Sequence, residues 1–161
     1  MKSVVIVTDV PFWRKSGGSL QRILTLVKYL SARTRLTVAF LETRTRVDEQ
    51  RLTALSLPVK LDVIGLGKLD SEGKKVFLGN FQKYMENNKF DACIIEYIRL
   101  AFLLEAVPRH TNTMLDTIDI ISKRNESFER MGLRDSERVS WQDELRIFNA
   151  FDRVLLIQRQ E

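Results

Sequence analysis

The chain has 161 residues, with 26 Lys and Arg against 21 Asp and Glu, a net charge of +5, and 44% hydrophobic residues. This length suits one domain with a core of its own, and the composition excludes a disordered chain. Cys93 and His110 are the only cysteine and histidine. The sequence therefore excludes an internal disulfide, a cysteine-based zinc site and any metal site that needs two imidazoles.

The first predicted elements alternate between strand and helix. Residues 4–8 are a short β-branched apolar run, typical of a strand buried on both faces. A loop with two glycines follows, and residues 19–32 carry apolar side chains at helical spacing, with Ser19 as the expected N-cap. Residues 36–41 form the next strand, which completes one strand–helix–strand unit.

The same alternation continues to the end of the chain. We expect helices at 47–55, 71–88, 100–107, 122–131 and 136–150, and strands at 59–66, 92–95, 113–118 and 153–157. Strands that alternate with helices indicate an α/β fold with a doubly wound, mostly parallel sheet flanked by helices. We expect a single domain over residues 1–161.

The net positive charge favours an anionic partner, such as nucleic acid, a phosphorylated ligand or an acidic membrane face, or serves solubility alone. The apolar run after Lys2 is too short for a signal peptide, and nothing approaches the roughly 20 apolar residues of a membrane span. We expect a cytoplasmic protein, with the inner face of the membrane as the alternative location. Aromatic residues do not recur as a stacking platform would need, so nucleic acid is disfavoured.

Ligands of open parallel sheets bind beyond the carboxyl ends of the strands. The candidate site residues are therefore those that follow the predicted strands: Asp9, Trp13, Arg14, Lys15, Gly17, Gly18, Glu96, Tyr97, Arg99, Asp116 and Asp119. His110 precedes a strand and so lies at the opposite end, which excludes a Ser-His-Asp or Cys-His arrangement. Cys93 falls inside a buried strand, where it serves packing.

The glycine pair opens a predicted helix. Gly17 and Gly18 allow close approach of the backbone to an anion at the helix start, or the loop merely needs a positive φ. Neither G-x-G-x-x-G nor a P-loop sequence occurs, so dinucleotide oxidoreductases and P-loop NTPases are disfavoured.

Two further groups of side chains suggest chemistry. Trp13, Arg14 and Lys15 form an aromatic and basic loop tip that suits a sugar ring and a phosphate, unless the aromatic residue folds back onto the sheet. Asp116 and Asp119 flank a strand end, where carboxylates orient hydroxyls, act as a base or hold a metal. Capping of the next helix is the alternative for Asp119.

Four segments, in this order and spacing, resemble the amino-terminal half of GT-B-fold retaining glycosyltransferases. They are residues 4–41 with the glycine pair, the F-D-hydrophobic-E-Y strand at 90–97, the D-x-x-D segment at 115–120 and the D-R-V strand at 151–157. The resemblance implies a Rossmann-like, acceptor-side domain. The donor-binding domain would follow it in the complete enzyme, because this chain has about half the needed length.

The resemblance also implies roles for the candidate residues. Gly17, Gly18 and Lys15 would face the diphosphate of a nucleotide-sugar donor, and a glycan or glycolipid acceptor would meet Trp13, Arg14, Glu96, Tyr97 and Arg99. Asp119, and with less support Asp116, would be catalytic, because Ile118 stands where the family often has a histidine. No cofactor or metal is expected.

The implied function is sugar transfer in the synthesis of surface polysaccharide. Two alternatives stay open at this point. One is a non-catalytic α/β module that binds an anionic ligand or a partner. The other is half of a different GT-B enzyme, such as a sugar-nucleotide epimerase.

Overall fold

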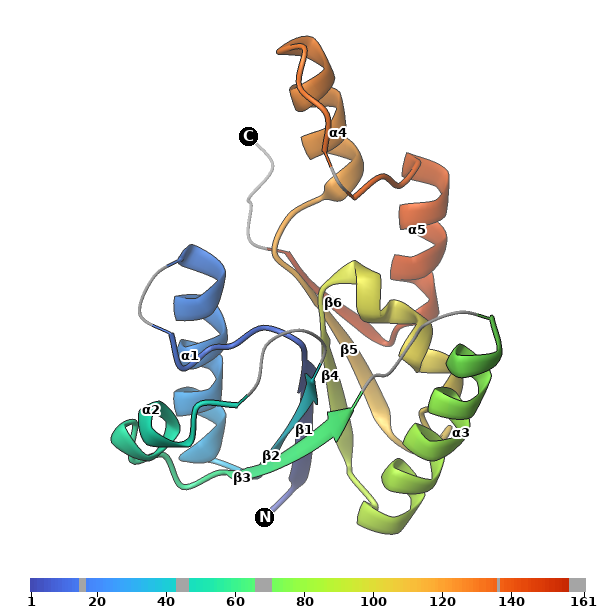
Figure 1. The fold of residues 1–161 in the computed structure, drawn as a ribbon. Coiled ribbons are helices and arrows are strands. Elements are labelled where there is room, and N and C mark those ends of the chain that lie inside the picture. The colour runs from blue at the N-terminus through green and yellow to red at the C-terminus, as the bar shows by residue number, and fades with distance from the viewer. Residues whose placement is uncertain (15–16, 43–46, 66–70, 136, 157–161) are drawn as a thin grey trace.

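The computed structural model describes residues 1–14, 17–42, 47–65, 71–135 and 137–156 (Figure 1). In chain order the elements are β1 (Ser3–Thr8), α1 (Gly18–Ser31), β2 (Arg35–Glu42), α2 (Glu49–Ala54), β3 (Lys60–Gly65), α3 (Ser71–Asn88), β4 (Ala92–Glu96), the 3₁₀ helix η1 (Ile98–Ala106), β5 (Asn112–Thr117), α4 (Ile121–Arg130), α5 (Trp141–Ala150) and β6 (Arg153–Leu156).

The six strands form one parallel sheet in the order β3-β2-β1-β4-β5-β6. The chain winds outward from β1 through β2 to β3, then returns to the middle and continues through β4, β5 and β6. The predicted α/β fold with a doubly wound parallel sheet is confirmed, and it is a Rossmann-like single domain. All carboxyl ends lie at one edge, as the prediction of the site requires.

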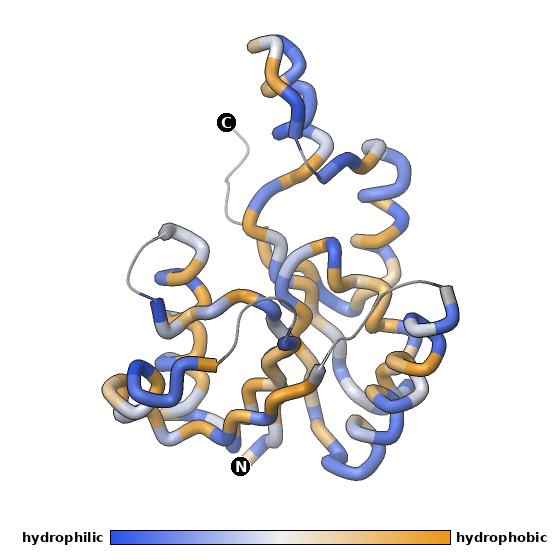
Figure 2. Tube along the Cα trace, viewed as in Figure 1, coloured by the Kyte–Doolittle hydropathy of each residue, from blue (hydrophilic) through white to orange (hydrophobic). Residues whose placement is uncertain are grey.

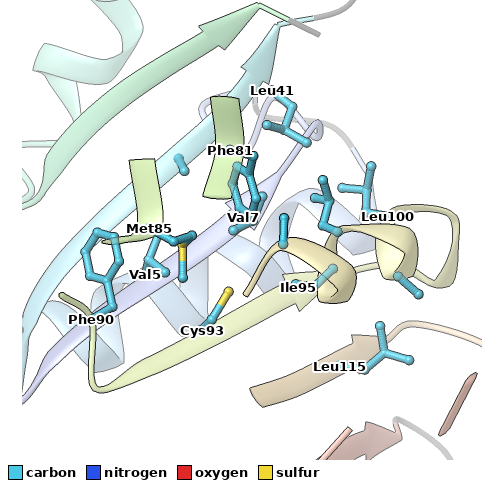
Figure 3. Packing of buried hydrophobic residues seen from close by; sticks show 14 of the residues in the cluster. Val5, Val7, Leu41, Phe81, Met85, Phe90, Cys93, Ile95, Leu100 and Leu115 are labelled. Atoms are coloured by element: carbon cyan, nitrogen blue, oxygen red, sulfur yellow. The ribbon is translucent and has the colours of Figure 1, made fainter. Parts of the chain in front are cut away.

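Helices cover both faces of the sheet and create two cores. One core joins α1 and α2 to the sheet and includes Ile6, Ile23, Val27 and Phe40. The other lies under α3, η1 and α5 and includes Val5, Phe81, Cys93 and Leu103 (Figure 3). Because β1 lies between the two cores, all six of its residues are buried. Figure 2 shows this as hydrophobic colour concentrated in the central strands and hydrophilic colour on the outer helices.

Several element boundaries differ from the sequence-based expectation. The helix expected at 136–150 begins only at Trp141, because Ser140 caps it by accepting a hydrogen bond from the Asp143 N–H (3.1 Å). The helix expected at 100–107 is a 3₁₀ helix that begins at Ile98. Ser19 does not cap α1, since the N-cap is Gly17.

In the described part of the chain, none of the helices combines the length and the hydropathy that crossing a membrane requires.

Candidate functional site

The candidate site lies at the carboxyl edge of the sheet, around the junction of β1 and β4. At this junction the chain connections diverge, because β1 leads to one side of the sheet and β4 to the other. Loops that leave neighbouring strands in opposite directions open a crevice between them. The loop after β1, the start of η1 after β4 and the segment after β5 lie at this edge, and α4 stands beyond the same edge (Figure 1).

Asp9 and Arg99 join the ends of β1 and β4. The Arg99 guanidinium donates two hydrogen bonds to the Asp9 carboxylate, at 3.1 Å from Nε and 2.6 Å from Nη2. Its carbon Cζ also lies 4.0 Å from the centre of the Tyr97 ring. Burial lowers the pKa of Arg99, but the hydrogen bonds and charge of Asp9 outweigh it, so the pKa is raised. Arg99 is therefore a fixed cation.

Tyr97 connects this pair to α1. It has a positive φ of 71°, which a bulky side chain rarely adopts, and it directs the chain from β4 into η1. Burial raises the pKa of the Tyr97 phenol, although a hydrogen bond with the Ser19 side chain opposes this. The strand end, η1 and the first turn of α1 thus meet at one tyrosine.

A second arginine gathers carboxylates after β5. Arg124 on α4 donates to Asp119 (3.0 Å), Asp135 (2.6 Å) and Glu137 (3.4 Å). Glu137 also accepts from Arg99 (3.3 Å), so the two arginines belong to one ion-pair network. Asp119 is therefore already paired with a cation.

Glu96 and Asp116 lie side by side at the ends of β4 and β5, where they are partners in the strand register. Asp116 is held by Arg22 of α1, whose Nε lies 3.1 and 3.2 Å from the two carboxylate oxygens, with a further bond from Nη2. Glu96 is fully buried, and its carboxyl oxygens have no hydrogen-bond partner among the described residues. Burial raises the pKa of Glu96 well above its usual value, as does Asp116, while Arg22 lowers it. Glu96 thus favours the neutral form.

The expected roles of Asp116 and Glu96 conflict with this burial. Glu96 has no exposed surface, so it meets no ligand without movement of Arg22 or α1. Asp116 has 2% of its side chain exposed and is held by Arg22, so it presents little more than this ion pair to the groove beside α1. The contact between Glu96 and an acceptor stays a prediction, and it would require such a movement. In the sequence, Glu96 stands at the end of an apolar strand. This position is typical both of a residue that binds a ligand and of a buried acid.

The glycines shape the start of α1. Gly17 has a φ of 122°, and an added Cβ there would lie 3.3 Å from Leu20 Cδ1. A Cβ on Gly18 would meet nothing within 4 Å, so the packing of the fold does not require a glycine at this position. No side chain caps this helix start among the described residues. Lys15, the third residue expected at a diphosphate, lies outside the described residues.

Trp13 is part of the core. It is 3% exposed, and its ring packs edge-on against Phe12 and Phe40, with centroids 5.3 and 4.7 Å away. Of the two alternatives for this loop, the structure shows the one in which the aromatic residue folds back onto the sheet, because burial of the indole gains more than exposure would. Arg14, the next residue, is exposed.

Two grooves flank α1. The first, of about 660 Å³, lies between the loop after β1 and α2 and is lined by Trp13, Arg14, Gln21, Leu24, Gln50, Arg51, Ala54 and Leu55. The second, of about 530 Å³, lies between α1 and the ends of β5 and β6, and the Arg22–Asp116 pair forms part of its wall. Both have the size of small-molecule sites.

A buried carboxylate on α5 escaped the sequence analysis. Glu144 is fully buried and accepts hydrogen bonds from the backbone N–H groups of Ile121 (2.6 Å) and Ser122 (3.0 Å), the first residues of α4. It thus caps a neighbouring helix, the role considered for Asp119. In the sequence, Glu144 could have been recognised as an acidic residue on the apolar face of the predicted helix.

His110 and Cys93, which the sequence places outside the candidate site, lie as expected. His110 is exposed just before β5, so it lies at the edge of the sheet opposite the candidate site. Cys93 is fully buried in β4, and burial raises its pKa to about 12. The predicted packing role of Cys93 is confirmed.

No family model matches the sequence, and no curated protein is similar to it. Among solved structures, the chain is similar to a short-chain dehydrogenase/reductase from Burkholderia vietnamiensis, with 12% identity and a TM-score of 0.46. The likeness covers 99% of this chain and 84% of that one. This finding contradicts the predicted resemblance to glycosyltransferases, because that structure is a dehydrogenase/reductase and not a GT-B enzyme. The glycosyltransferase resemblance and the enzyme class that it implied are corrected accordingly, and the α/β pattern that suggested them is shared by many Rossmann-like folds. The expected role in the synthesis of surface polysaccharide is not tested by this comparison.

Proposed function

We propose that this protein binds a small anionic molecule, with a phosphate or carboxylate group, in the groove between the loop after β1 and α2. The observation that carries the proposal is the pair of arginines in one groove. Arg14 comes from the loop after β1 and Arg51 from α2, so two arginines from separate elements line the groove. An anion between them would receive hydrogen bonds from both, and guanidinium groups match the geometry of phosphate and carboxylate.

Arg14 differs from the other arginines near the carboxyl edge of the sheet. Arg22, Arg99 and Arg124 each have a carboxylate partner. Arg14 has no ion-pair partner in the part of the chain that the structure describes, and its side chain is exposed. Its charge is therefore available to a ligand.

The loop holds Arg14 in place through its neighbours. The Arg14 N–H donates to the Pro11 carbonyl (3.0 Å) and the Phe12 N–H to the Val10 carbonyl (2.8 Å). Trp13 anchors the turn in the core against Phe40. A fixed backbone lowers the entropy that ligand binding has to overcome.

Arg51 has a weak internal partner. It pairs with Asp48 at 3.2 Å, but both side chains are more than a third exposed. Exposed pairs of this kind contribute about 0–1 kcal/mol, so a ligand anion competes with Asp48 readily.

The remaining lining residues define the rest of the ligand. Leu24, Ala54 and Leu55 give the groove an apolar wall, and Gln21 and Gln50 add amide groups. We infer a ligand with one anionic group and an apolar or aromatic body, because the lining combines both properties.

The test is a titration followed by ¹H–¹⁵N NMR with phenyl phosphate, inorganic phosphate and phenol. Phenyl phosphate should shift signals of the groove residues and bind more tightly than either fragment alone. Arg14→Gln should weaken its binding at least tenfold, since a hydrogen bond to a charged group contributes about 1.5–3 kcal/mol. Arg109→Gln removes an exposed arginine beside His110 at the opposite edge and should leave binding unchanged. Equal losses in both variants, or shifts spread away from the groove, would refute the proposal.

The cytoplasmic location expected from the sequence stays a prediction, and the buried thiol of Cys93 is compatible with it. The alternative, an inner membrane face, is tested by flotation with anionic vesicles.

A further inference from the structure

The amino ends of the strands carry a concentration of positive charge that neither groove uses. Because the strands are parallel, their first residues lie at one edge of the sheet, opposite the candidate site (Figure 1). Segments 1–3, 28–35 and 86–92 lie at this edge, where β1, β2 and β4 begin and α1 and α3 end. These segments have a net charge of +3, against +5 for the whole chain. Their cations, which we call the basic edge, are Lys2, Lys28, Arg33, Arg35 and Lys89.

The strand register places these cations beside one another. Ser3 of β1 is opposite Arg35 of β2, and the Arg35 N–H donates to the Lys2 carbonyl (2.9 Å). On the other side of β1, the Asp91 N–H donates to the Ser3 carbonyl (2.8 Å), which brings the segment after Lys89 next to the start of β1. Neighbouring strands are about 4.8 Å apart, so the positions that carry these cations follow one another closely along the edge.

The protein itself does not neutralise the cations of the basic edge. All five are exposed, and none has an ion-pair partner among the described residues. The two acids of these segments have other partners: Glu86 accepts from the Gln82 amide (2.9 Å), and Asp91 accepts from the Ser3 N–H (2.7 Å). The carboxyl edge differs, because the three arginines described there each have a carboxylate partner.

Stabilisation of helix ends accounts for only part of the basic edge. A cation near a helix C-terminus interacts favourably with the helix dipole, which suits Lys28 in the last turn of α1 and Lys89 just after α3. Lys2 and Arg35 stand at the start of strands, which have no comparable dipole. Like charges on neighbouring strands repel each other, so these two residues cost the fold stability. An anion from outside the chain would offset this repulsion.

Apolar side chains beside the cations distinguish between anionic partners. Met1 is 86% exposed and Tyr29 is 56% exposed. The Arg33 guanidinium lies over the Tyr29 ring, with its Cζ atom 4.0 Å from the ring centre. Tyrosine, other apolar side chains and cations together are typical of a protein surface that meets an anionic membrane. Single-stranded nucleic acid stacks on several exposed rings, whereas Tyr29 is alone in these segments because Phe90 is buried.

We propose that the basic edge binds the surface of a bilayer that contains anionic phospholipid. The five cations lie against the headgroup phosphates, and Met1 and Tyr29 enter the interface without crossing the bilayer. The protein therefore rests on the lipid in one orientation, with the amino ends of its strands toward the membrane. The anion groove then faces the water, since Arg14 follows the carboxyl end of β1, and the two surfaces share no residue.

Flotation of the full chain with phospholipid vesicles tests the proposal. Vesicles of phosphatidylcholine with about one quarter phosphatidylglycerol should carry the protein upward at about 0.1 M NaCl, whereas pure phosphatidylcholine vesicles should not. Binding should be lost at about 1 M NaCl, because the Debye length falls from about 10 Å to about 3 Å. Flotation that does not depend on the charge of the lipid, or none with the anionic vesicles, would overturn the proposal.

Two double variants with the same change in net charge locate the binding surface. Lys2→Gln with Arg35→Gln should weaken vesicle binding about 25-fold, since each cation at an anionic lipid surface contributes a factor of about five. Arg130→Gln with Arg134→Gln removes two exposed arginines beyond the opposite edge of the sheet and should keep binding within about twofold of the wild type. Equal losses in the two double variants would show that net charge alone matters and would overturn the assignment of the surface.

A further double variant covers the case in which the first does not fold. Lys28→Gln with Lys89→Gln changes two exposed side chains without ion-pair partners, so it should fold and weaken vesicle binding by a similar factor. Competition with duplex DNA at an equal concentration of phosphate separates the two kinds of polyanion. Protein that stays on the vesicles supports the proposal, whereas protein that moves to the DNA would assign the basic edge to nucleic acid and overturn it.

Discussion

Replacing Glu96 with glutamine removes a buried acid while it keeps the shape of the side chain. Glu96 is fully buried at the end of β4, beside Asp116 and without a hydrogen-bond partner among the described residues. Burial raises its pKa well above the ordinary value of 4.5, and Asp116 adds to the increase. Glutamine is neutral at every pH, so the variant isolates the effect of this one titration.

The sign follows from proton binding. Above pH 4.5 the unfolded chain loses the Glu96 proton, while the folded protein keeps it up to its raised pKa. Stability therefore falls as pH rises through this window, by up to about 1.4 kcal/mol per pH unit. Below pH 4.5 both states are protonated, and the contribution no longer changes. The variant lacks this term, so its advantage over the wild type should grow with pH.

The assay is urea unfolding of both proteins at intervals from pH 4.5 to pH 7.5. The free energy of unfolding of Glu96→Gln minus that of the wild type should increase with pH, with a maximum slope near 1.4 kcal/mol per unit. Titrations of groups that do not interact with Glu96 cancel in this difference. Parallel pH curves would refute the reasoning, because they would show that the Glu96 carboxyl ionises alike in the folded and unfolded chain.

Two further substitutions test the buried charges of this region. Glu144→Ala removes the acceptor of the Ile121 and Ser122 N–H groups and should lower the free energy of unfolding by about 2–4 kcal/mol, with loss of α4 helicity measured by amide exchange. Arg22→Met should cost about 3–5 kcal/mol in urea unfolding, because Asp116 loses its cation while only 2% exposed. Adding Asp116→Leu to Arg22→Met should recover most of this loss, and a double variant no more stable than the single one would contradict the buried-pair explanation.

The strand positions could be predicted from the sequence because each depends on local pattern. The β-branched run at the start of β1 and the apolar run of β4 both lie where expected. Alternation of such runs with amphipathic segments is enough to predict a parallel α/β sheet. It is too widely shared to assign a family, and the glycosyltransferase resemblance rested on that pattern.

The location of the site was predictable, but the state of its side chains was not. The strand-end rule placed Asp9, Arg99 and Asp119 at one edge, and the structure brings them into one ion-pair network with Arg124 and Glu137. The sequence does not show which acids are already neutralised. That depends on pairs made across the sheet.

By itself, the sequence determined the elements, the fold class and the edge of the sheet where polar residues gather. Only the tertiary structure decided which of those residues are exposed and which are buried or held in ion pairs. Arg22 and Asp116 are 94 residues apart, and they meet because β5 lies beside β4 and α1 covers that face. The same packing buries Trp13 and Glu96 and leaves Arg14 exposed. Periodicity is a property of near neighbours in the chain, whereas burial and ion pairing depend on segments that only folding brings together.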